Sequence, residues 1–179
     1  NPFVTGWFAN PTLYFFIQAA FLRLFGVNAA ALRLSSALAS TGVAILLYLF
    51  ARHHFGRWMA VLTTILFSTY HYAIHFGRMA INNSWNPLFA LGVLYCVSRG
   101  LKARSLHRLV VAGVLLGLSP YFDAGARLIP IILAVYLIYW GLREPDLFRE
   151  NMGRLAVLAF VALFVALPLL RYFGAHPKD

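Results

Sequence analysis

Residues 30–51 read AALRLSSALASTGVAILLYLFA, an apolar run in which Arg33 is the only charged residue. A helix needs about 20 predominantly apolar residues to cross the hydrocarbon core of a bilayer, so this stretch is long enough to span a membrane. Further apolar stretches follow it at residues 58–76, 87–98, 109–122, 128–142 and 155–170. We therefore expect an all-α fold, a polytopic transmembrane helix bundle with about five to six spanning helices.

The composition of the whole chain supports this expectation. Of its 179 residues, 61% are hydrophobic and 11% are charged, and its mean hydropathy is +0.75. Soluble domains are typically about 45–50% apolar and about 25% charged. The 15 basic residues exceed the 5 acidic ones, but they separate apolar stretches singly, so we expect a lipid bilayer and no nucleic acid as partner.

The segment before the first span differs from the rest. Residues 11–27 (PTLYFFIQAAFLRLFGV) are aromatic-rich, and Gln18 and Arg23 interrupt their apolar pattern. A helix of this kind is typical of the membrane interface, and Gly26 is a suitable C-terminal stop. No internal repeat of 20–50 residues is visible, so we expect one membrane domain over residues 1–179.

Basic residues are distributed unequally between the two sets of connecting segments. The segments after residues 51, 98 and 142 carry Arg52, Arg57, Arg99, Lys102, Arg104, Arg108, Arg143, Arg149 and Arg154. The opposite ends carry Arg23, Arg33, Arg78, Arg127, Arg171 and Lys178. Because the more basic side is cytosolic, residues 1–33 are expected to be extracytoplasmic. His53 and His54 then fall in a cytosolic loop, where we interpret them as solvated surface residues.

Polar residues gather around the end of the stretch 58–76. His71, His75, Arg78 and Asn82 are spaced i, i+4, i+7 and i+11, which places them on one face of a continuous helix. One interpretation is a cavity wall on which Arg78 binds an anionic headgroup. The other is an arginine that reaches the interface beside histidines bonded to neighbouring helices. A zinc site at the two histidines lacks a third ligand, so no metal site is predicted.

Two loops on the same side add candidate residues. Asn82, Asn83 and Asn86 form either the amide rim of a sugar-sized pocket or a polar loop with an interfacial anchor at Trp85. In the second loop, YFDAGARLIP, Asp123 is a candidate general base. An ion pair with Arg127, four residues later, is the favoured interpretation of Asp123.

The segments PTLYFFIQAAFLRLFGV, ALRLSSALAS, LYLFARHHFGR, HFGRMAINNSWNP and YFDAGARLIP occur in an order that resembles a known family. They are similar to prokaryotic membrane glycosyltransferases of the GT-C class, relatives of protein O-mannosyltransferases and aminoarabinose transferases. The resemblance implies a multi-pass enzyme of the plasma (inner) membrane. It implies transfer of a sugar from a polyprenyl-phosphate-linked donor to a lipid, protein or glycan acceptor on the extracytoplasmic face.

The resemblance also implies roles for individual residues. Arg33, Arg78 and Arg127 match positions where the family often carries arginine, which implies contact with the donor phosphate or support of the cavity. We count with them, as candidate substrate-binding residues, His75, Asn82, Asn83 and Tyr121. Where relatives often carry an aspartate near the start of the stretch 87–98, this chain has Asn86. No cofactor is assigned, and the need for a divalent metal is left open.

The family's catalytic acid lies in the first outer loop, before the segment that matches residues 11–14. Residues 1–30 contain no acidic residue, so we expect this acid to lie upstream of Asn1, with Asp123 as the weaker candidate. We therefore expect a fragment of a longer enzyme that lacks the first transmembrane helix and its acidic outer loop, and we expect residues 1–179 alone to be inactive.

The alternative function is a transporter or flippase of an anionic lipid or solute. The same outer arginines would then line a transit route. Transporters of this kind often contain inverted repeats, and the absence of a visible repeat disfavours this alternative.

Overall fold

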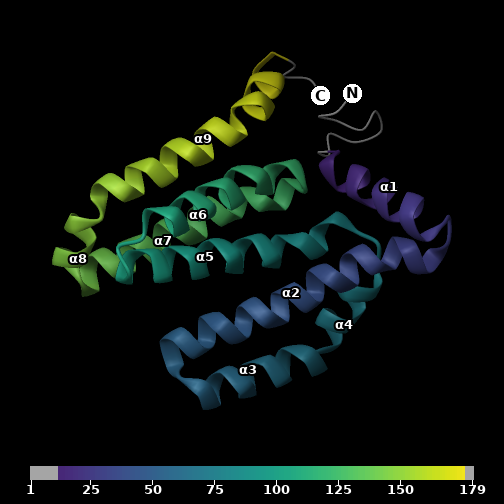
Figure 1. Ribbon diagram of the computed structural model, residues 1–179, viewed down its shortest axis with the longest axis horizontal. Helices are drawn as coiled ribbons and strands as arrows, with labels where there is room; N and C mark the ends of the chain where they lie inside the picture. Colours follow the sequence, from purple (N-terminus) through teal and green to yellow (C-terminus); the bar gives the residue numbers. More distant parts are fainter. Residues whose placement is uncertain (1–11, 176–179) are drawn as a thin grey trace.

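The computed structural model describes residues 12–175, and within them every regular element is a helix (Figure 1). This confirms the predicted all-α class. The long elements are α1 (Leu13–Phe25), α2 (Ala29–Phe55), α3 (Arg57–Thr69), α4 (His71–Arg78), α5 (Asn86–Lys102), α6 (Leu106–Leu118), α7 (Leu128–Arg143), α8 (Pro145–Glu150) and α9 (Met152–Ala175). Three short 3-10 helices connect them, η1 (Asn82–Trp85), η2 (Ser119–Tyr121) and η3 (Ala124–Arg127).

Two of the predictions concern the N-terminal part of the chain. Asn1 and the residues after it up to residue 11 lie outside the described residues. The structure therefore does not test whether a catalytic acid lies upstream of Asn1, nor whether residues 1–11 are extracytoplasmic. Both stay predictions.

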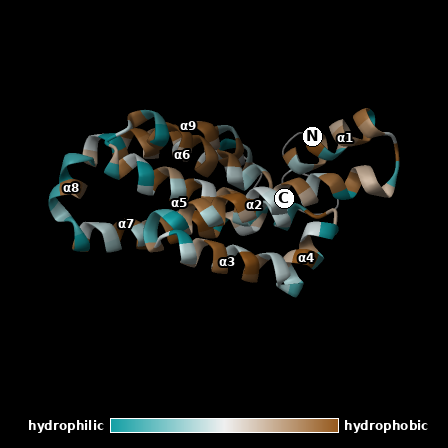
Figure 2. Cartoon of the chain, turned by 60° about the horizontal axis from the view of Figure 1, so that its bottom comes forward, coloured by the Kyte–Doolittle hydropathy of each residue, from teal (hydrophilic) through white to brown (hydrophobic). Residues whose placement is uncertain are grey.

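Three helical stretches in the described residues are long and apolar enough to cross a membrane, namely Ala29–Phe55, Ala124–Arg143 and Met152–Gly174. Shorter apolar helices occur at Leu13–Phe25 and Leu106–Tyr121. Large apolar side chains face outward from these helices, as Val135 and Leu163 do (Figure 2). Such a surface is typical of a chain whose solvent is lipid. The chain is thus a multi-pass membrane protein, and the count of five to six spans stays a prediction.

The long helices run back and forth between two ends of the bundle. Figure 1 shows α2, α5 and α7 running in one direction and α6 and α9 returning. One end holds the α2–α3 turn, the α5–α6 loop and α8, and with them the nine basic residues that the sequence places on the cytosolic side. We call it the basic end. The opposite end holds α4 and the three short helices, and we call it the polar-loop end.

The predicted helix over residues 58–76 is wrong in one respect, because the chain breaks at Tyr70 into α3 and α4. Tyr70 has an extended backbone (φ −70°, ψ 124°). The hydroxyl of Thr69 donates to the carbonyls of Ile65 and Leu66, at 3.0 and 3.2 Å. Serine and threonine hydroxyls that bond to the preceding turn compete with continuation of a helix. The direction of the chain therefore changes just before the histidines.

Other predicted boundaries shift by a few residues. The predicted stretch 109–122 is regular only to Leu118, because Pro120 follows and the chain tightens into η2. The segment 11–27 contains α1, which ends at Gly26 with a φ of +83°, and its interfacial position stays a prediction. His53 and His54 lie in the last turn of α2 and are half-buried, so their placement in a solvated loop is wrong.

Close contact between α6 and α9 depends on two glycines spaced four apart, Gly113 and Gly117. A Cβ atom on Gly113 would lie 2.7 Å from the carbonyl oxygen of Leu158, and one on Gly117 would lie 2.6 Å from that of Ala162. Small residues at this spacing let membrane helices approach closely enough for van der Waals packing. The two helices therefore pack backbone against backbone.

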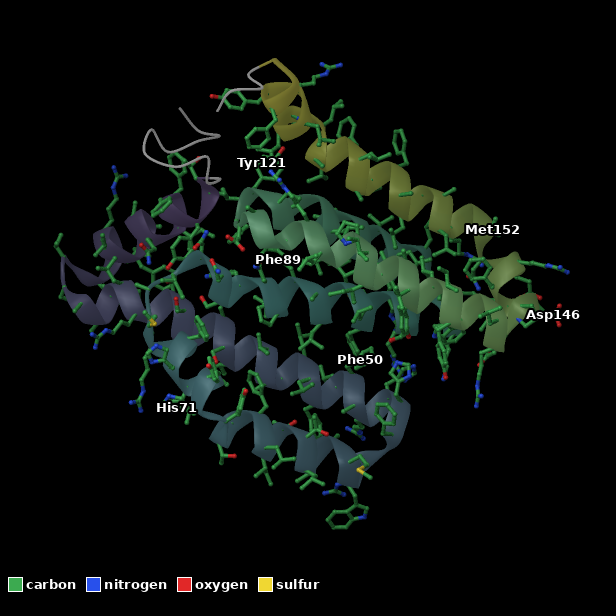
Figure 3. All side chains as sticks on the ribbon, turned by 180° about the vertical axis from the view of Figure 1, so that it is seen from behind. Phe50, His71, Phe89, Tyr121, Asp146 and Met152 are labelled. Carbon is green, nitrogen blue, oxygen red and sulfur yellow. The ribbon has the colours of Figure 1, made fainter. Side chains whose placement is uncertain are left out.

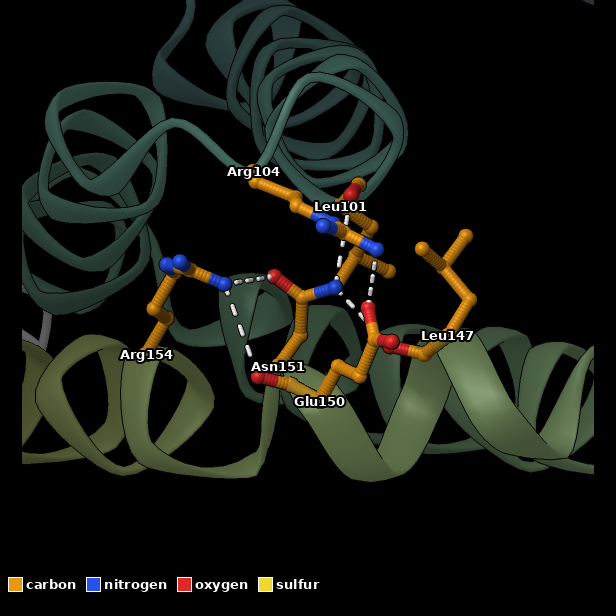
Figure 4. Close-up of polar contacts among 6 residues, drawn as sticks. All are labelled: Leu101, Arg104, Leu147, Glu150, Asn151 and Arg154. Atoms are coloured by element: carbon orange, nitrogen blue, oxygen red, sulfur yellow. Dashed lines mark hydrogen bonds and ion pairs between the residues drawn. The ribbon is translucent and has the colours of Figure 1, made fainter.

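The basic end is held together by Asn151, which is fully buried (Figure 4). Its Nδ2 donates to the carbonyl oxygens of Leu101 (3.3 Å) and Leu147 (2.8 Å), and its Oδ1 accepts from Arg154 Nη1 (2.9 Å). The Arg104–Glu150 ion pair lies beside it. These bonds tie α5 to the α8–α9 corner.

Candidate functional site

Asp123 is the centre of a polar cluster at the polar-loop end, and it is only 6% exposed. Its Oδ1 accepts a hydrogen bond from Asn82 Nδ2 at 3.0 Å. Its Oδ2 accepts from Asn86 Nδ2 at 2.6 Å and from the backbone N–H of Gly125 at 3.0 Å. A buried carboxylate requires such partners. The cluster therefore joins two loops that lie about forty residues apart in the sequence.

Local structure places each member of this cluster. Asn82 begins η1, and Asn86 is the first residue of α5, just before a proline in the first turn. Asp123 caps η3 with an extended backbone, as aspartate commonly does at a helix start. Gly125 leaves room for the carboxylate, because a Cβ there would lie 2.7 Å from Asp123 Oδ2 and 3.1 Å from Asn86 Nδ2.

This geometry corrects the predicted Asp123–Arg127 ion pair. Asp123 lies outside the helix (φ −158°, ψ 147°), so the i,i+4 geometry does not form, and among residues 12–175 the ion pair found is Arg104–Glu150. The general-base hypothesis is not tested directly. Both carboxylate oxygens of Asp123 are already engaged by donors, which favours a positioning role.

An aromatic layer lies against the cluster. The Phe122 ring is 5.0 Å from that of Trp85 and 4.8 Å from that of Phe89, centroid to centroid. Two polar atoms here are buried without a hydrogen-bond partner, Trp85 Nε1 and Asn86 Oδ1. Buried polar groups are usually paired, so this donor and this acceptor are candidate contacts for a bound molecule.

Arg127 lines a separate apolar cavity of about 650 Å³ between α6, α7 and α9. It is the only charged residue of the lining, which comprises Leu116, Gly117, Pro120, Ala124, Arg127, Pro130, Ala159, Ala162, Leu163, Ala166, Leu169, Leu170 and Phe173. Ala124 follows Asp123 directly, so this cavity adjoins the polar cluster. An exposed guanidinium at one edge of a long apolar groove suits an amphiphile with an anionic head.

Arg78 and Asn83 lie elsewhere. Arg78 lines a cavity of about 360 Å³ with residues of α2 and α3, and Asn83 lines one of about 320 Å³ with Tyr70 and Pro87. Arg78 ends α4, so Asn82 is not on a common helical face with it, and the predicted i+11 continuation is wrong. The structure thus brings Asn82 to Asp123, whereas Arg78 and Arg127 line different cavities.

The remaining candidates are exposed. The rings of His71 and His75 stack with centroids 6.0 Å apart on α4, and Arg33 is exposed near the start of α2. In the view of Figure 3, His71 and Tyr121 lie on opposite sides of Phe89. Across the described residues, no group of three or more metal-ligating side chains lies close enough together to hold an ion.

Tyr121 has a structural role that its sequence context did not reveal. Its hydroxyl donates to the carbonyl oxygen of Val165 at 2.9 Å and accepts from the N–H of Leu169 at 3.3 Å. These two backbone groups lie next to Pro168, which interrupts the hydrogen bonding of α9. The hydroxyl therefore bridges a gap in the α9 ladder, which occupies it before any substrate does.

Replacing Tyr121 with phenylalanine is expected to lower the free energy of unfolding by about 1–3 kcal/mol, because two backbone groups lose their partner. Hydrogen exchange should accelerate at Leu169 in particular, and Tyr172→Phe on the same helix is the comparison variant. Unchanged exchange at Leu169 in Tyr121→Phe would contradict this role.

The sequence singled out Asn86 but not its contact with Asp123. The pairing depends on how the η1 and η3 loops meet, which no local pattern reveals. An available signal was the pair Asn82 and Asn86, spaced four apart before a proline. Amides that are costly to bury near a membrane need a partner, and Asp123 is the one acidic residue described at this end.

A multi-pass helical bundle with a polar cluster beside an apolar, arginine-edged groove defines a membrane protein built to hold an anionic amphiphile at one end. The model of the dolichyl-phosphate-mannose-protein mannosyltransferase family matches residues 9–172, and the chain belongs to this family. The expected resemblance to GT-C glycosyltransferases is thereby confirmed, and the transporter alternative is not favoured. No curated protein sequence matches the chain.

One solved structure is similar, that of ArnT from Cupriavidus metallidurans bound to undecaprenyl phosphate. The two chains are 18% identical, with a TM-score of 0.70. The match covers 94% of this chain and 32% of the ArnT chain, so the chain spans about a third of that protein's length. At this identity the likeness shows the fold.

Proposed function

We propose that this chain forms the donor-binding part of a membrane glycosyltransferase. In this proposal the donor is a sugar linked to polyprenyl phosphate, and the acceptor is a lipid, protein or glycan. The polar-loop end faces the extracytoplasmic side of the plasma (inner) membrane. Family membership supports the reaction class, and the ligand in the ArnT structure supports a polyprenyl phosphate as the lipid.

The observation that carries the proposal is the cavity of about 650 Å³ edged by Arg127. A polyprenyl phosphate has a long apolar chain and a compact anionic head. The apolar lining suits the chain, and a guanidinium forms paired hydrogen bonds to phosphate oxygens. Asp123 lies next to this cavity and holds Asn82 and Asn86 in place.

Roles follow for the other candidates. Trp85 Nε1 and Asn86 Oδ1 are the free polar atoms beside Asp123, so we propose that they contact the sugar. Asp123 is a positioning residue, and the acid that activates the acceptor is not assigned within this chain. Arg33, Arg78, His75 and Asn83 stay candidate substrate contacts on the family pattern. Since Arg78 and Arg127 line different cavities, they would bind different groups.

Replacing Arg127 with glutamine is expected to weaken the binding of undecaprenyl phosphate about 10- to 100-fold. A hydrogen bond to a charged group contributes about 1.5–3 kcal/mol, and about 1.4 kcal/mol corresponds to a factor of ten. The measurement is titration of undecaprenyl phosphate into the purified chain in phosphatidylcholine nanodiscs. Undecaprenol, which lacks the phosphate, should bind the variant and the parent equally.

Arg143→Gln is the matched control, because it removes the same charge from the far end of the same helix. Its affinity for undecaprenyl phosphate should stay within about twofold of the parent. Equal weakening by the two variants would show only a general charge effect. Unchanged affinity in Arg127→Gln would remove the phosphate from this cavity.

A further inference from the structure

A second, smaller cavity lies at the basic end, on the other side of the bundle's length from Asp123. Its volume is about 400 Å³, and it is lined by Leu49, Arg52, His53, Tyr95 and Arg99. The first three residues belong to the last turns of α2, and the other two belong to α5. Figure 3 labels Phe50, which marks this end of α2.

The charges of this cavity are not balanced by the protein. Its lining contains two guanidinium groups and no carboxylate. Of the four acidic residues described, Asp123 lies at the opposite end and Glu150 is paired with Arg104. Two like charges beside one cavity repel each other, and an anion between them would remove that repulsion.

His53 adds an unsatisfied donor or acceptor. Its Nε2 is buried and has no hydrogen-bond partner, whereas Nε2 of the neighbouring His54 lies 3.4 Å from the hydroxyl of Tyr136. A buried ring nitrogen without a partner is unusual and calls for one. The cavity therefore offers two guanidinium forks, one imidazole nitrogen and the hydroxyl of Tyr95 around a common space.

Orientation in the membrane does not explain this arrangement. Basic residues that set topology need only lie in the connecting segments. Arg52 and Arg99 instead lie within helices and face one cavity together with His53. Basic pockets between membrane helices on the more basic side are known sites for phosphorylated lipid headgroups.

We propose that the Arg52–His53–Tyr95–Arg99 cavity binds a phosphate group, presented either by an anionic phospholipid headgroup or by free phosphate. The arginines bind the phosphate oxygens, Tyr95 donates to them, and Leu49 provides the apolar edge. This site is separate from the cavity at Arg127 and does not depend on the proposed transfer reaction.

The test uses the purified chain in phosphatidylcholine nanodiscs. Labelled phosphatidylglycerol is titrated in one arm and inorganic phosphate in the other. We expect the double variant Arg52→Gln/Arg99→Gln to lose at least tenfold in affinity for the arm that binds. Binding of the labelled lipid alone identifies a headgroup, and binding of inorganic phosphate identifies the free anion.

The control is Arg57→Gln/Arg143→Gln, which removes the same charge at the same end but outside the cavity. It should change the affinity by less than about twofold. Thermal unfolding of both double variants checks that they fold, and Arg99→Lys, which keeps the charge but loses the fork, should weaken binding by an intermediate factor. Equal losses in the two double variants, or no binding of either probe to the parent, would overturn the proposal. Undecaprenyl phosphate affinity should be unchanged in Arg52→Gln/Arg99→Gln, which separates this site from the one at Arg127.

Discussion

Replacing Asp123 with alanine is expected to lower the free energy of unfolding by about 3 kcal/mol or more. The carboxylate accepts from Asn82, Asn86 and Gly125 at a site that is almost fully buried. Its removal leaves two amides and one backbone N–H without this partner, and an unsatisfied buried group costs about 1–3 kcal/mol. The measurement is the midpoint of thermal unfolding in detergent, combined with hydrogen exchange at η1 and η3.

Asp146→Ala is the control, because Asp146 is exposed on α8 at the other end of the bundle (Figure 3). It should leave the unfolding midpoint nearly unchanged, since isolated surface charges contribute little. Gly125→Ala should resemble Asp123→Ala, because a Cβ at Gly125 would crowd the held carboxylate. Equal midpoints for Asp123→Ala and Asp146→Ala would show that the cluster does not hold the two loops.

The helices could be predicted from the sequence because hydrophobicity over a window is a local property. The predicted stretch 128–142 matches α7, which begins at Leu128 and ends at Arg143 before a glutamate and a proline. The break at Tyr70 could not be predicted in this way. Its neighbours are apolar enough to continue, and the break depends on how Thr69 bonds to the preceding turn.

The candidate site was predictable only in part. The pattern located Asp123, Arg127 and the asparagines at one end of the bundle, where the structure also places them. Membership of one end does not fix a shared cavity, because an end of a bundle has several faces. Contacts such as that between Asn86 and Asp123 depend on the packing of segments 37 residues apart.

The charge pattern had a second meaning that topology alone concealed. Nine basic residues at one end suffice to orient the chain, and the sequence offers no reason to separate Arg52 and Arg99 from the others. The distinction arises because α2 and α5 extend beyond the predicted residues 51 and 98. Arg52 and Arg99 thereby become helical residues that face one cavity.

Replacing Gly117 with leucine is expected to separate α6 from α9 and to lower the free energy of unfolding by about 3 kcal/mol. A Cβ at this position would lie 2.6 Å from the carbonyl oxygen of Ala162 and 2.7 Å from Cβ of Val165. Neither atom is the end of a flexible side chain, so the helix backbones must move apart, and overpacking typically costs about 1–3 kcal/mol or more. Thermal unfolding in detergent measures the loss.

The same substitution at Gly153 is the control, because a Cβ there meets nothing within 4 Å. Leucine is favoured over glycine in a helix by up to about 1 kcal/mol, so Gly153→Leu should unfold at the parent temperature or slightly above it. Gly117 also lines the cavity edged by Arg127, so its variant should lose affinity for undecaprenyl phosphate together with stability. If Gly117→Leu lost stability but kept that affinity, the apolar chain would not lie between α6 and α9. The position of the lipid is thus tested independently of the charge at Arg127.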